Sequence, residues 1–359
     1  MAMIDDFRKL VQMEDAQVYD DIARLRRISG PWSPWTFHFP QSQPKVIIEP
    51  NSVDAMQNIL ASCDREGIDI LVMGGATGTQ HRNSSPIVMS TARLTAIAIN
   101  HETMQLEAGA GATVDAVEAA AVEAGYTTGQ WLSSGKSATV GGSYKTNAHG
   151  LLAGRYGRFT DAVTAVDSDN SGRVSALTMA LHLPPAARAI SVFRVGSEGL
   201  SVLREVGRAR LNPARMHLTE ANVLTLIVEG EPLLESGRYQ LIAGVINHFG
   251  GHLAAGIDTD ALWDNALRTD LWAANKQGIC WADRIFIDVD WNHLALFLDG
   301  VNTLRSAEAG TVELAFSLPT PSGFSAELFL ECPPNHQDIL SMYSTLNALA
   351  KRCQESQRG

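Results

Sequence analysis

Short apolar runs alternate with an amphipathic stretch near the start of the chain. Residues 45–49 and 68–73 are apolar runs too short for helices. Between them, one face at helical spacing is shared by Val53, Met56, Ile59, Leu60 and Cys63. Asn51 is a suitable helix cap and Gly67 a suitable stop. The pattern predicts a β-α-β unit over residues 45–73, followed by a glycine-bearing loop at 74–79.

The pattern then changes to successive strands. Apolar runs at 87–90, 95–99 and 104–109 predict strands, a helix is expected at 114–124, and a second glycine-rich stretch at 139–150 precedes a strand at 162–167. Beyond residue 181 the composition shifts, and further strands with a helix at about 234–249 predict a separate α+β domain. The first 30 residues are expected to form a helix. No internal sequence repeat is visible.

Charge and composition exclude several classes of protein. The net charge is -11 and there is no run of Lys or Arg, which argues against a nucleic-acid partner. The four cysteines lie far apart, and His248 and His252 are separated by two glycines, so we expect no metal site. No segment is apolar enough for a signal peptide or a membrane span, which predicts a soluble, cytoplasmic protein without membrane contacts.

Two loops could bind phosphate. GGATGT at 74–79 directly follows a strand, and glycines there let backbone N–H groups converge on a dinucleotide diphosphate, although such a loop is more often only a tight turn. SSGKS at 133–137 resembles the end of a P-loop. Residues 130–134 separate Gly129 from Gly135, however, which is one residue more than that motif has. The sequence therefore argues against an ATPase.

The order of these pieces resembles the FAD-linked oxidases of the vanillyl-alcohol oxidase and D-lactate dehydrogenase type. The matching parts are PKVIIEP at 44–50, GGATG at 74–78, Leu94 and Ile97 with EAGAGAT at 107–113, TVGGSYKTNAHG at 139–150, and RYG at 155–157 with Asp161 and Val163. The resemblance implies an α+β fold. A two-subdomain, PCMH-type FAD-binding domain would span residues 44–180, after an N-terminal helix and loop at 1–43 and before an α+β, ferredoxin-like cap domain at 181–359.

The resemblance also implies a cofactor and a reaction. FAD would accept a hydride from a small or medium organic substrate. The residues that the resemblance places at FAD are Gly74, Gly75, Ala76, Thr77, Gly78, Thr79, His81, Gly141, Gly142, Thr146, Asn147, Gly150 and Tyr156. Relatives with covalent flavin carry a histidine directly after the glycine pair. Ala76 stands there, so we expect non-covalent FAD unless a shifted loop brings His81 to the ring.

Four further residues are candidates for catalysis. Lys145 and Arg155 could stabilise negative charge on reduced flavin, and His149 could act as a general acid or base, with Tyr144 beside them. The alternatives are surface ion pairs for the cations and a structural hydrogen bond for the histidine. In the cap domain, the candidate substrate contacts are Trp263, Trp272, Asn275, Lys276 and Arg284, although aromatic residues at such spacing are more often core.

The chain departs from the family pattern in two places. Val174 passes almost directly to SALTMALHLPP, without the helix and glycine-rich segment that usually contribute main-chain contacts to FAD, and GSEGL at 196–200 is instead expected to begin a cap-domain helix. The usual closing segment is also absent. Two alternatives remain open. In the first, FAD is bound with fewer contacts, and a partner chain or a second copy could complete its site. In the second, the fold is kept without hydride chemistry, for a redox-neutral reaction such as a cyclisation or as a non-catalytic subunit.

Overall fold

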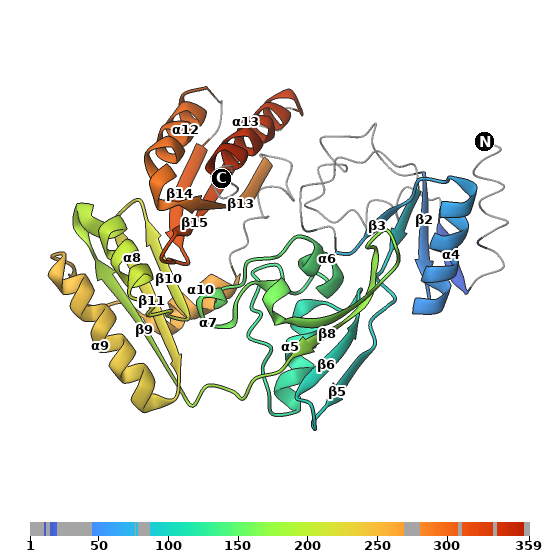
Figure 1. Ribbon diagram of the computed structural model, residues 1–359, viewed down its shortest axis with the longest axis horizontal. Helices are drawn as coiled ribbons and strands as arrows, with labels where there is room; N and C mark the ends of the chain where they lie inside the picture. Colours follow the sequence, from blue (N-terminus) through green and yellow to red (C-terminus); the bar gives the residue numbers. More distant parts are fainter. Residues whose placement is uncertain are drawn as a thin grey trace. The chain divides into compact units, whose positions relative to one another are not determined.

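The protein divides into two compact units (Figure 1). The computed structural model describes Val11 and residues 15–19, 45–75, 77, 87–268, 281–307, 311–332 and 336–354. One unit comprises Met1–Gly150 and Gly157–Leu183, and the other comprises Leu151–Tyr156 and Pro184–Gly359. The short stretch Leu151–Tyr156, which directly follows the second glycine-rich loop, therefore belongs to the C-terminal unit.

The first sheet of the N-terminal unit is built around the predicted β-α-β unit. Its order is β1-β2-β4-β3, with β2, β4 and β3 parallel. The strands are β1 (Ala16–Tyr19), β2 (Val46–Pro50), β3 (Leu71–Met73) and β4 (Ile87–Ser90). Helix α4 (Val53–Glu66) buries Met56, Ile59 and Leu60, and Gly67 ends it with a left-handed φ of 65°. The predicted helical face and its glycine stop are confirmed.

Two details at the start of this sheet differ from the expectation. Residues 16–19 form a strand rather than part of a helix, because they pair antiparallel with the edge of β2 and so satisfy its backbone groups. The rest of the expected N-terminal helix lies outside the described residues, apart from Val11. Ser52 rather than Asn51 caps α4, since its Oγ accepts from Ala55 N at 3.1 Å. The Asn51 side chain instead donates to Asp15 Oδ1 at 2.6 Å.

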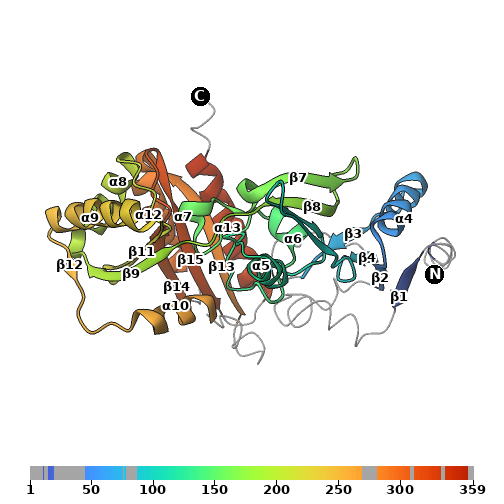
Figure 2. The same ribbon diagram turned by 90° about the horizontal axis from the view of Figure 1, so that it is seen from below.

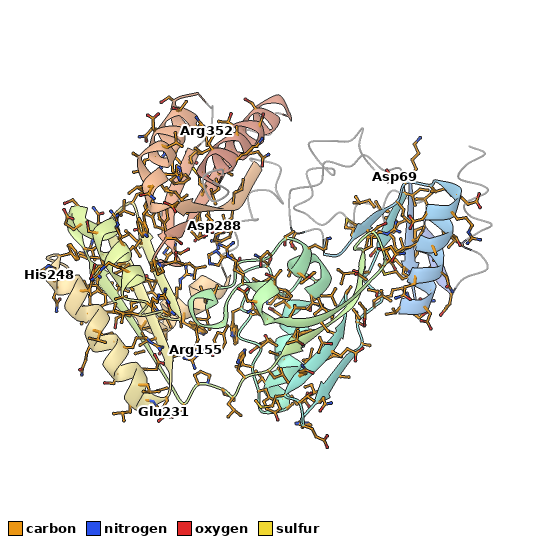
Figure 3. The ribbon with its side chains drawn as sticks, in the orientation of Figure 1. Asp69, Arg155, Glu231, His248, Asp288 and Arg352 are labelled. Atoms are coloured by element: carbon orange, nitrogen blue, oxygen red, sulfur yellow. The ribbon has the colours of Figure 1, made fainter. Side chains whose placement is uncertain are left out.

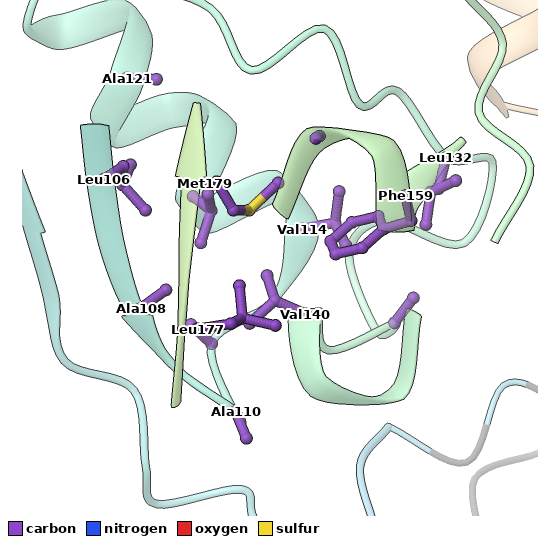
Figure 4. Packing of buried hydrophobic residues seen from close by; sticks show 14 of the residues in the cluster. Leu106, Ala108, Ala110, Val114, Ala121, Leu132, Val140, Phe159, Leu177 and Met179 are labelled. Carbon is purple, nitrogen blue, oxygen red and sulfur yellow. The ribbon is translucent and has the colours of Figure 1, made fainter. Parts of the chain in front are cut away.

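The second sheet of this unit has the order β5-β6-β8-β7 and is antiparallel. Its elements are β5 (Ile97–Asn100), β6 (Gln105–Gly109), α5 (Val114–Glu123), α6 (Val140–Lys145), the 3-10 turn η2 (Phe159–Ala162), β7 (Val163–Ser168) and β8 (Val174–Ala180). Leu106, Leu177 and Met179 on the strands pack with Val140 and Phe159 in one apolar core (Figure 4). The glycine-rich second loop is thereby anchored on the sheet.

A tight hairpin joins β7 to β8. Asp169 Oδ1 accepts from the backbone N–H groups of Ser171 and Arg173. Arg173 also pairs with Asp169 and with Asp64 of α4, both at 2.5 Å, which ties the hairpin to the first sheet's helix. After this turn the chain runs directly from Val174 along β8 to Ala180, as expected.

The C-terminal unit contains one seven-stranded antiparallel sheet built from two halves. The first half contains β9 (Ala187–Arg194), the turn η3 (Gly196–Glu198), α8 (Gly199–Arg208), β10 (Arg215–Thr219), β11 (Val223–Gly230), α9 (Pro232–His248) and β12 (His252–Leu253). Their order, β12-β9-β11-β10, is the ferredoxin-like arrangement. GSEGL does lead into α8, as expected.

The second half repeats this topology without a matching sequence. After α10 (Thr259–Arg268), it contains β13 (Trp281–Asp290), the turn η4 (Trp291–His293), α12 (Leu294–Ala307), β14 (Thr311–Ser317), β15 (Gly323–Cys332) and α13 (His336–Gln354). The strands lie in the order β14-β15-β13, and β14 pairs with β10 to join the halves. The sequence showed no repeat because only the order of elements recurs.

The two faces of this sheet differ in character. Helices α8, α9 and α12 lie on one side of the strands (Figure 2), where Met216, Leu218 and Leu328 are buried. Because side chains alternate along a strand, Arg215, His217 and Glu327 lie on the other side. The seven-stranded sheet therefore has one apolar, helix-covered face and one polar face.

Candidate functional site

The two predicted glycine turns meet in the N-terminal unit. A Cβ added to Gly75 would lie 1.7 Å from the carbonyl oxygen of Ser137, and one added to Gly74 would lie 2.0 Å from Thr139 Oγ1. At Gly75 no side chain fits without moving the backbone, and at Gly74 the Thr139 side chain would have to give way. The loop after β3 and the turn that leads into α6 are therefore in direct contact, and glycine is required for that contact.

The first turn presents unused main-chain donors. Within the described residues, no acceptor takes up the N–H of Gly74 or of Gly75. Both residues are half-buried, so these groups are reachable but not fully solvated. Converging N–H groups of this kind bind phosphate or carboxylate oxygens.

The second turn is different, because its donors are already used. Val140 N donates to Ala112 O at 2.9 Å, Gly141 N to Ala110 O at 3.0 Å and Gly142 N to Thr139 Oγ1 at 3.3 Å. A Cβ on Gly141 would lie 2.7 Å from that of Ala110. The glycines at the start of α6 thus serve close packing against the end of β6, and they leave no free N–H for an anion.

The predicted site residues that come after α6 are held by bonds within the same unit. Lys145 Nζ donates to Gly172 O of the β7–β8 hairpin at 3.2 Å, and Thr146 Oγ1 donates to Gly142 O at 3.0 Å. Asn147 has a left-handed φ of 47°, and its Oδ1 accepts from Thr160 N and Oγ1 at 3.2 and 2.7 Å. These bonds fix the course of the segment.

The remaining predicted residues of that segment lie close by. Tyr144 packs against the apolar core, and the half-buried His149 comes directly after Ala148, whose carbonyl accepts from Phe159 N. A Cβ on Gly150 would lie 3.4 Å from Trp131 O. Residues 144–150 are therefore brought together beside residues 130–131.

The sequence alone did not identify Glu118, which holds residues 127–128, just before residues 130–131. Glu118 of α5 is 6% exposed, and its carboxylate accepts from Thr128 N at 2.9 Å and from the hydroxyls of Thr127 and Thr128, both at 2.5 Å. A buried carboxylate with three donors is well satisfied. The signal in the sequence was the position of Glu118, which shares the buried face of an alanine-rich helix with Val114, Val117 and Ala121.

Arg155 and Tyr156 belong to the other unit. Arg155 Nη1 donates to the carbonyl oxygen of Glu229 at 2.6 Å, and Tyr156 OH donates to Glu229 Oε1 at 2.7 Å. Burial, together with the hydrogen bond to Glu229, raises the pKa of Tyr156. The structure therefore groups these two residues with β11 and not with the glycine turns. Thr77 is half-buried, and Ala76, Gly78, Thr79 and His81 lie outside the described residues.

Comparison with known proteins identifies the glycine-turn region. Residues 44–173 match a family model described as an FAD binding domain. This stretch is an FAD-binding domain. The chain is also 25% identical over 226 residues to D-lactate dehydrogenase of Archaeoglobus fulgidus, a match that covers 61% of the chain and 48% of that relative. The chain thus spans about half the length of the curated relative it matches.

Solved structures share the fold of nearly the whole chain, from the FAD-binding domain through the C-terminal sheet. p-Cresol methylhydroxylase superposes with a TM-score of 0.75 at 11% identity, covering 97% of this chain and 86% of that one. 4-Ethylphenol oxidase from Gulosibacter chungangensis gives 0.72 at 10% identity, with 97% and 87% covered. Alkyldihydroxyacetonephosphate synthase gives 0.70 at 12% identity, with 87% and 72% covered. The α+β fold class and the resemblance to FAD-linked oxidases are confirmed.

The residues of the FAD-binding domain fit its cofactor at the first glycine turn. The unused N–H groups of Gly74 and Gly75 suit a diphosphate, and the close contact with Ser137 leaves room there for backbone only. The start of α6 adds packing rather than donors. Fewer main-chain donors are therefore available in these two turns than the sequence predicted.

Metal-binding and membrane-spanning features are absent from the part of the chain that the structure describes. No group of three or more His, Cys, Asp or Glu residues in those ranges could hold a metal ion. His248 is the last residue of α9 and His252 begins β12. None of the helices in the described ranges is long and apolar enough to cross a membrane.

Proposed function

We propose that this chain is an FAD-dependent oxidoreductase that oxidises a small or medium organic substrate by hydride transfer to non-covalently bound flavin. The observation that carries the proposal is the pair of unused N–H groups at Gly74 and Gly75, inside a stretch that matches an FAD binding domain. The 25% identity to a D-lactate dehydrogenase is consistent with oxidation of an organic acid or alcohol.

Each part of the domain has a separate task in this proposal. The amides of Gly74 and Gly75 bind diphosphate oxygens, and the Glu118 carboxylate holds residues 127–128 in place. Bound FAD supplies the hydride acceptor. His149 is the residue we propose for proton transfer, with Tyr144 and Lys145 beside it. Arg155 and Tyr156, whose donors are taken by Glu229, serve to hold the C-terminal unit together.

A redox-neutral conversion is the second candidate. The direct run of the chain from Val174 through β8 favours it, because no helix and glycine-rich segment follows Val174 to supply further main-chain donors to the cofactor. Proteins with this fold include one named as a synthase as well as oxidases and dehydrogenases, so the fold does not choose between them. Completion of the site by a second copy or a partner subunit is a further proposal motivated by the same missing segment.

A visible spectrum of the purified protein tests the first step. Bound oxidised flavin gives a yellow solution, and acid precipitation that leaves the colour in the supernatant shows that it is not covalently attached. Anaerobic addition of candidate alcohols and 2-hydroxy acids should then bleach the flavin. Product formation with flavin that stays oxidised would favour the redox-neutral candidate, and a colourless protein that cannot be loaded with FAD would overturn both.

The glycine turn itself is tested by Gly75→Ala. The added methyl would collide with Ser137 O, so the turn must shift and its N–H groups must lose their alignment. We expect FAD to bind at least tenfold more weakly, as measured by fluorescence titration. Gly244→Ala is the matched control, because Gly244 lies in α9 with nothing within 4 Å of its added Cβ. Equal affinity in the two variants would contradict the assignment.

A further inference from the structure

The outer face of helix α9 in the C-terminal unit is apolar. Leu233, Leu234 and Leu241 are 82%, 68% and 61% exposed, which places them among the most exposed large apolar side chains of the described residues. The opposite face of the helix packs on the sheet through the buried Ile242 and Ile246. A group of exposed apolar side chains on one element marks an interaction surface more often than a group scattered over several elements does.

The edge strand beside α9 extends this apolar surface. Leu253 of β12 is 58% exposed, and its strand neighbour is Phe193. Phe193 lies on the same side of β9 as Ser191, whose Oγ donates to the hydroxyl of Tyr239 of α9 at 3.2 Å. Leu253 therefore lies on the side of the sheet that α9 covers.

Two glycines on the outer face have no packing role in the described chain. Gly237 and Gly244 are exposed, and no described atom lies within 4 Å of a Cβ added to either. Glycine is less favourable than alanine inside a helix. Gly207 of α8 differs, because its added Cβ would lie 2.5 Å from Thr320 O. Gly237 and Gly244 thus leave the backbone of α9 bare at two points, where a second helix can approach closely.

The charged residues of α9 lie away from the middle of this face. Glu235 is buried and pairs with Arg238 at 2.8 Å. Glu231 and His248, both labelled in Figure 3, mark the two ends of the helix. The face between them carries no Lys or Arg that would attract anionic lipid. It also carries no charge that would be repelled by its own copy across a two-fold axis.

The order of residues on this face suits an antiparallel copy of the same helix. The outward positions 233, 237, 240, 241, 244 and 248 have spacings that read the same in both directions. In two such helices related by an axis between Gln240 and Leu241, Gly237 of each copy faces Gly244 of the other. Leu241 of each copy then fits beside the two bare glycines of the other.

The ends of the helix are complementary in the same arrangement. The N-terminal end of α9, with Glu231, meets the C-terminal end of the other copy, with His248. An imidazole N–H can donate to a carboxylate, and antiparallel helices bring ends of opposite partial charge together. Glu205 of α8, whose charge is close enough to interact with that of His248, is already paired with Arg208 at 2.5 Å.

We propose that α9 is the contact surface of a two-fold symmetric homodimer, in which the α9 helices of two copies pack antiparallel. A pair of helices of this length, with Leu253 at its flank, buries on the order of 1,000 Å², near the lower limit for a specific interface. We therefore expect a dissociation constant in the micromolar range. The surface lies outside residues 44–173, which match the FAD binding domain, so the inference does not rest on the proposed function.

Analytical ultracentrifugation of the purified, intact protein tests the dimer over a micromolar concentration series. We expect a monomer–dimer equilibrium in the wild type. Leu241→Glu places a charge beside its own copy and should weaken dimerisation at least tenfold. Val122→Glu on α5, which is 57% exposed, is the matched control and should dimerise as the wild type does. Monomers at every wild-type concentration would overturn the proposal and leave the face to a different protein, and equal dimerisation of the two variants would also overturn it.

The double variant Gly237→Ala with Gly244→Ala separates a dimer contact from a purely structural face. At a concentration where the wild type is monomeric, the melting temperature should rise by a few degrees, because alanine favours the helix and its Cβ meets nothing in the described chain. Dimerisation should nevertheless weaken at least tenfold, since the added methyl groups hold the two backbones apart. Dimerisation as strong as in the wild type would overturn the glycine contact.

Cysteine crosslinking tests the antiparallel arrangement. Gln240→Cys lies beside the two-fold axis, so it should form a disulfide with its own copy in the presence of copper–phenanthroline. The two copies of the exposed position Asn247 lie about 20 Å apart along the helix axis in the proposed pair, so Asn247→Cys should remain uncrosslinked. Crosslinking of both variants would indicate parallel helices, and a dimer in which Gln240→Cys fails to crosslink would equally overturn the arrangement.

Discussion

The two halves of the C-terminal sheet carry comparable buried glutamates in opposite states. In the first half, Glu229 on β11 accepts from Arg188 Nε at 2.5 Å and from Tyr156 OH at 2.7 Å, while its carbonyl accepts from Arg155. In the second half, Glu327 on β15 has Arg284 and His217, but Arg215 and Ser325 nearby lack acceptors among the described residues.

The difference lies in the segments that the chain places over each half. In the first half, Leu151–Tyr156 brings its own donors to Glu229, and Trp263 of α10 lies under the Arg188 guanidinium at 3.9 Å. Glu235 gives Arg155 a second acceptor at 3.3 Å. The guanidinium groups of Arg155 and Arg188 therefore both have acceptors in the folded protein. A satisfied cluster of this kind stabilises the fold, whereas buried donors without acceptors reduce what a cluster contributes to stability.

The sharpest test of this comparison removes one arginine from each half. Arg188→Gln leaves the carboxylate of Glu229, which is fully buried, without its cation, so we expect a loss of about 4 kcal/mol in the free energy of unfolding. Arg215→Gln removes a cation that has no acceptor in the described chain, so we expect a change within about 1 kcal/mol. Urea denaturation followed by tryptophan fluorescence measures both. Equal losses would show that the two clusters do not differ as described.

The next prediction concerns the pH dependence of stability in the second half. The folded pKa of Glu327 is near 2, below its ordinary 4.5, because the hydrogen bond from His217 and the charge of Arg284 outweigh the opposing effect of burial. Its contribution is therefore complete above pH 4.5 and is lost as the pH falls toward 2. One pKa unit corresponds to ~1.4 kcal/mol, so the contribution is about 3 kcal/mol.

The measurement is the difference in unfolding free energy between wild type and Glu327→Gln. We expect the gap to be widest near neutral pH and to narrow between about pH 4.5 and 3. Glu313→Gln, an exposed position on β14, serves as the control and should give no such change. A gap that stays constant with pH would mean that Glu327 is not held ionised by its neighbours.

The smallest effect comes from the hydroxyl groups. Tyr156→Phe removes a donor to a buried carboxylate and should cost about 1–2 kcal/mol. Ser325→Ala removes a hydroxyl without a partner and should leave the free energy of unfolding unchanged or slightly raised. Thermal denaturation of the two single variants measures both changes in stability. Greater destabilisation by Ser325→Ala than by Tyr156→Phe would reverse the comparison.

Local patterns in the sequence were sufficient for much of the FAD-binding domain. Apolar runs predicted β2 and β4, the spacing of Met56, Ile59 and Leu60 predicted α4, and Gly67 predicted its end. These signals are local because a strand or helix reveals its buried face within a few residues. The turn at Gly74 and Gly75 was also predicted from the sequence. Glycine is informative there because the close backbone contact leaves no room for a Cβ at Gly75.

The features that depend on distant pairing could not be predicted. Ala16–Tyr19 became a strand only because β2 offered it an edge. The alternation in 215–219 shows that Arg215 and His217 share a face, but it does not show whether that face meets water or Glu327, more than a hundred positions later. Arg284 was a candidate from sequence, whereas its partners became apparent only through the order of the strands.

The exchange of Leu151–Tyr156 between units limits how the protein can be divided. A fragment ending at Leu183 would keep Tyr156 and Arg155 but lose Glu229, and the complementary fragment would keep Glu229 without its tyrosine. Neither fragment would then keep the hydrogen bonds that join Arg155 and Tyr156 to Glu229. A cut at the apparent boundary would therefore separate hydrogen-bonding partners, so each isolated fragment is expected to be less stable than the same residues in the intact chain.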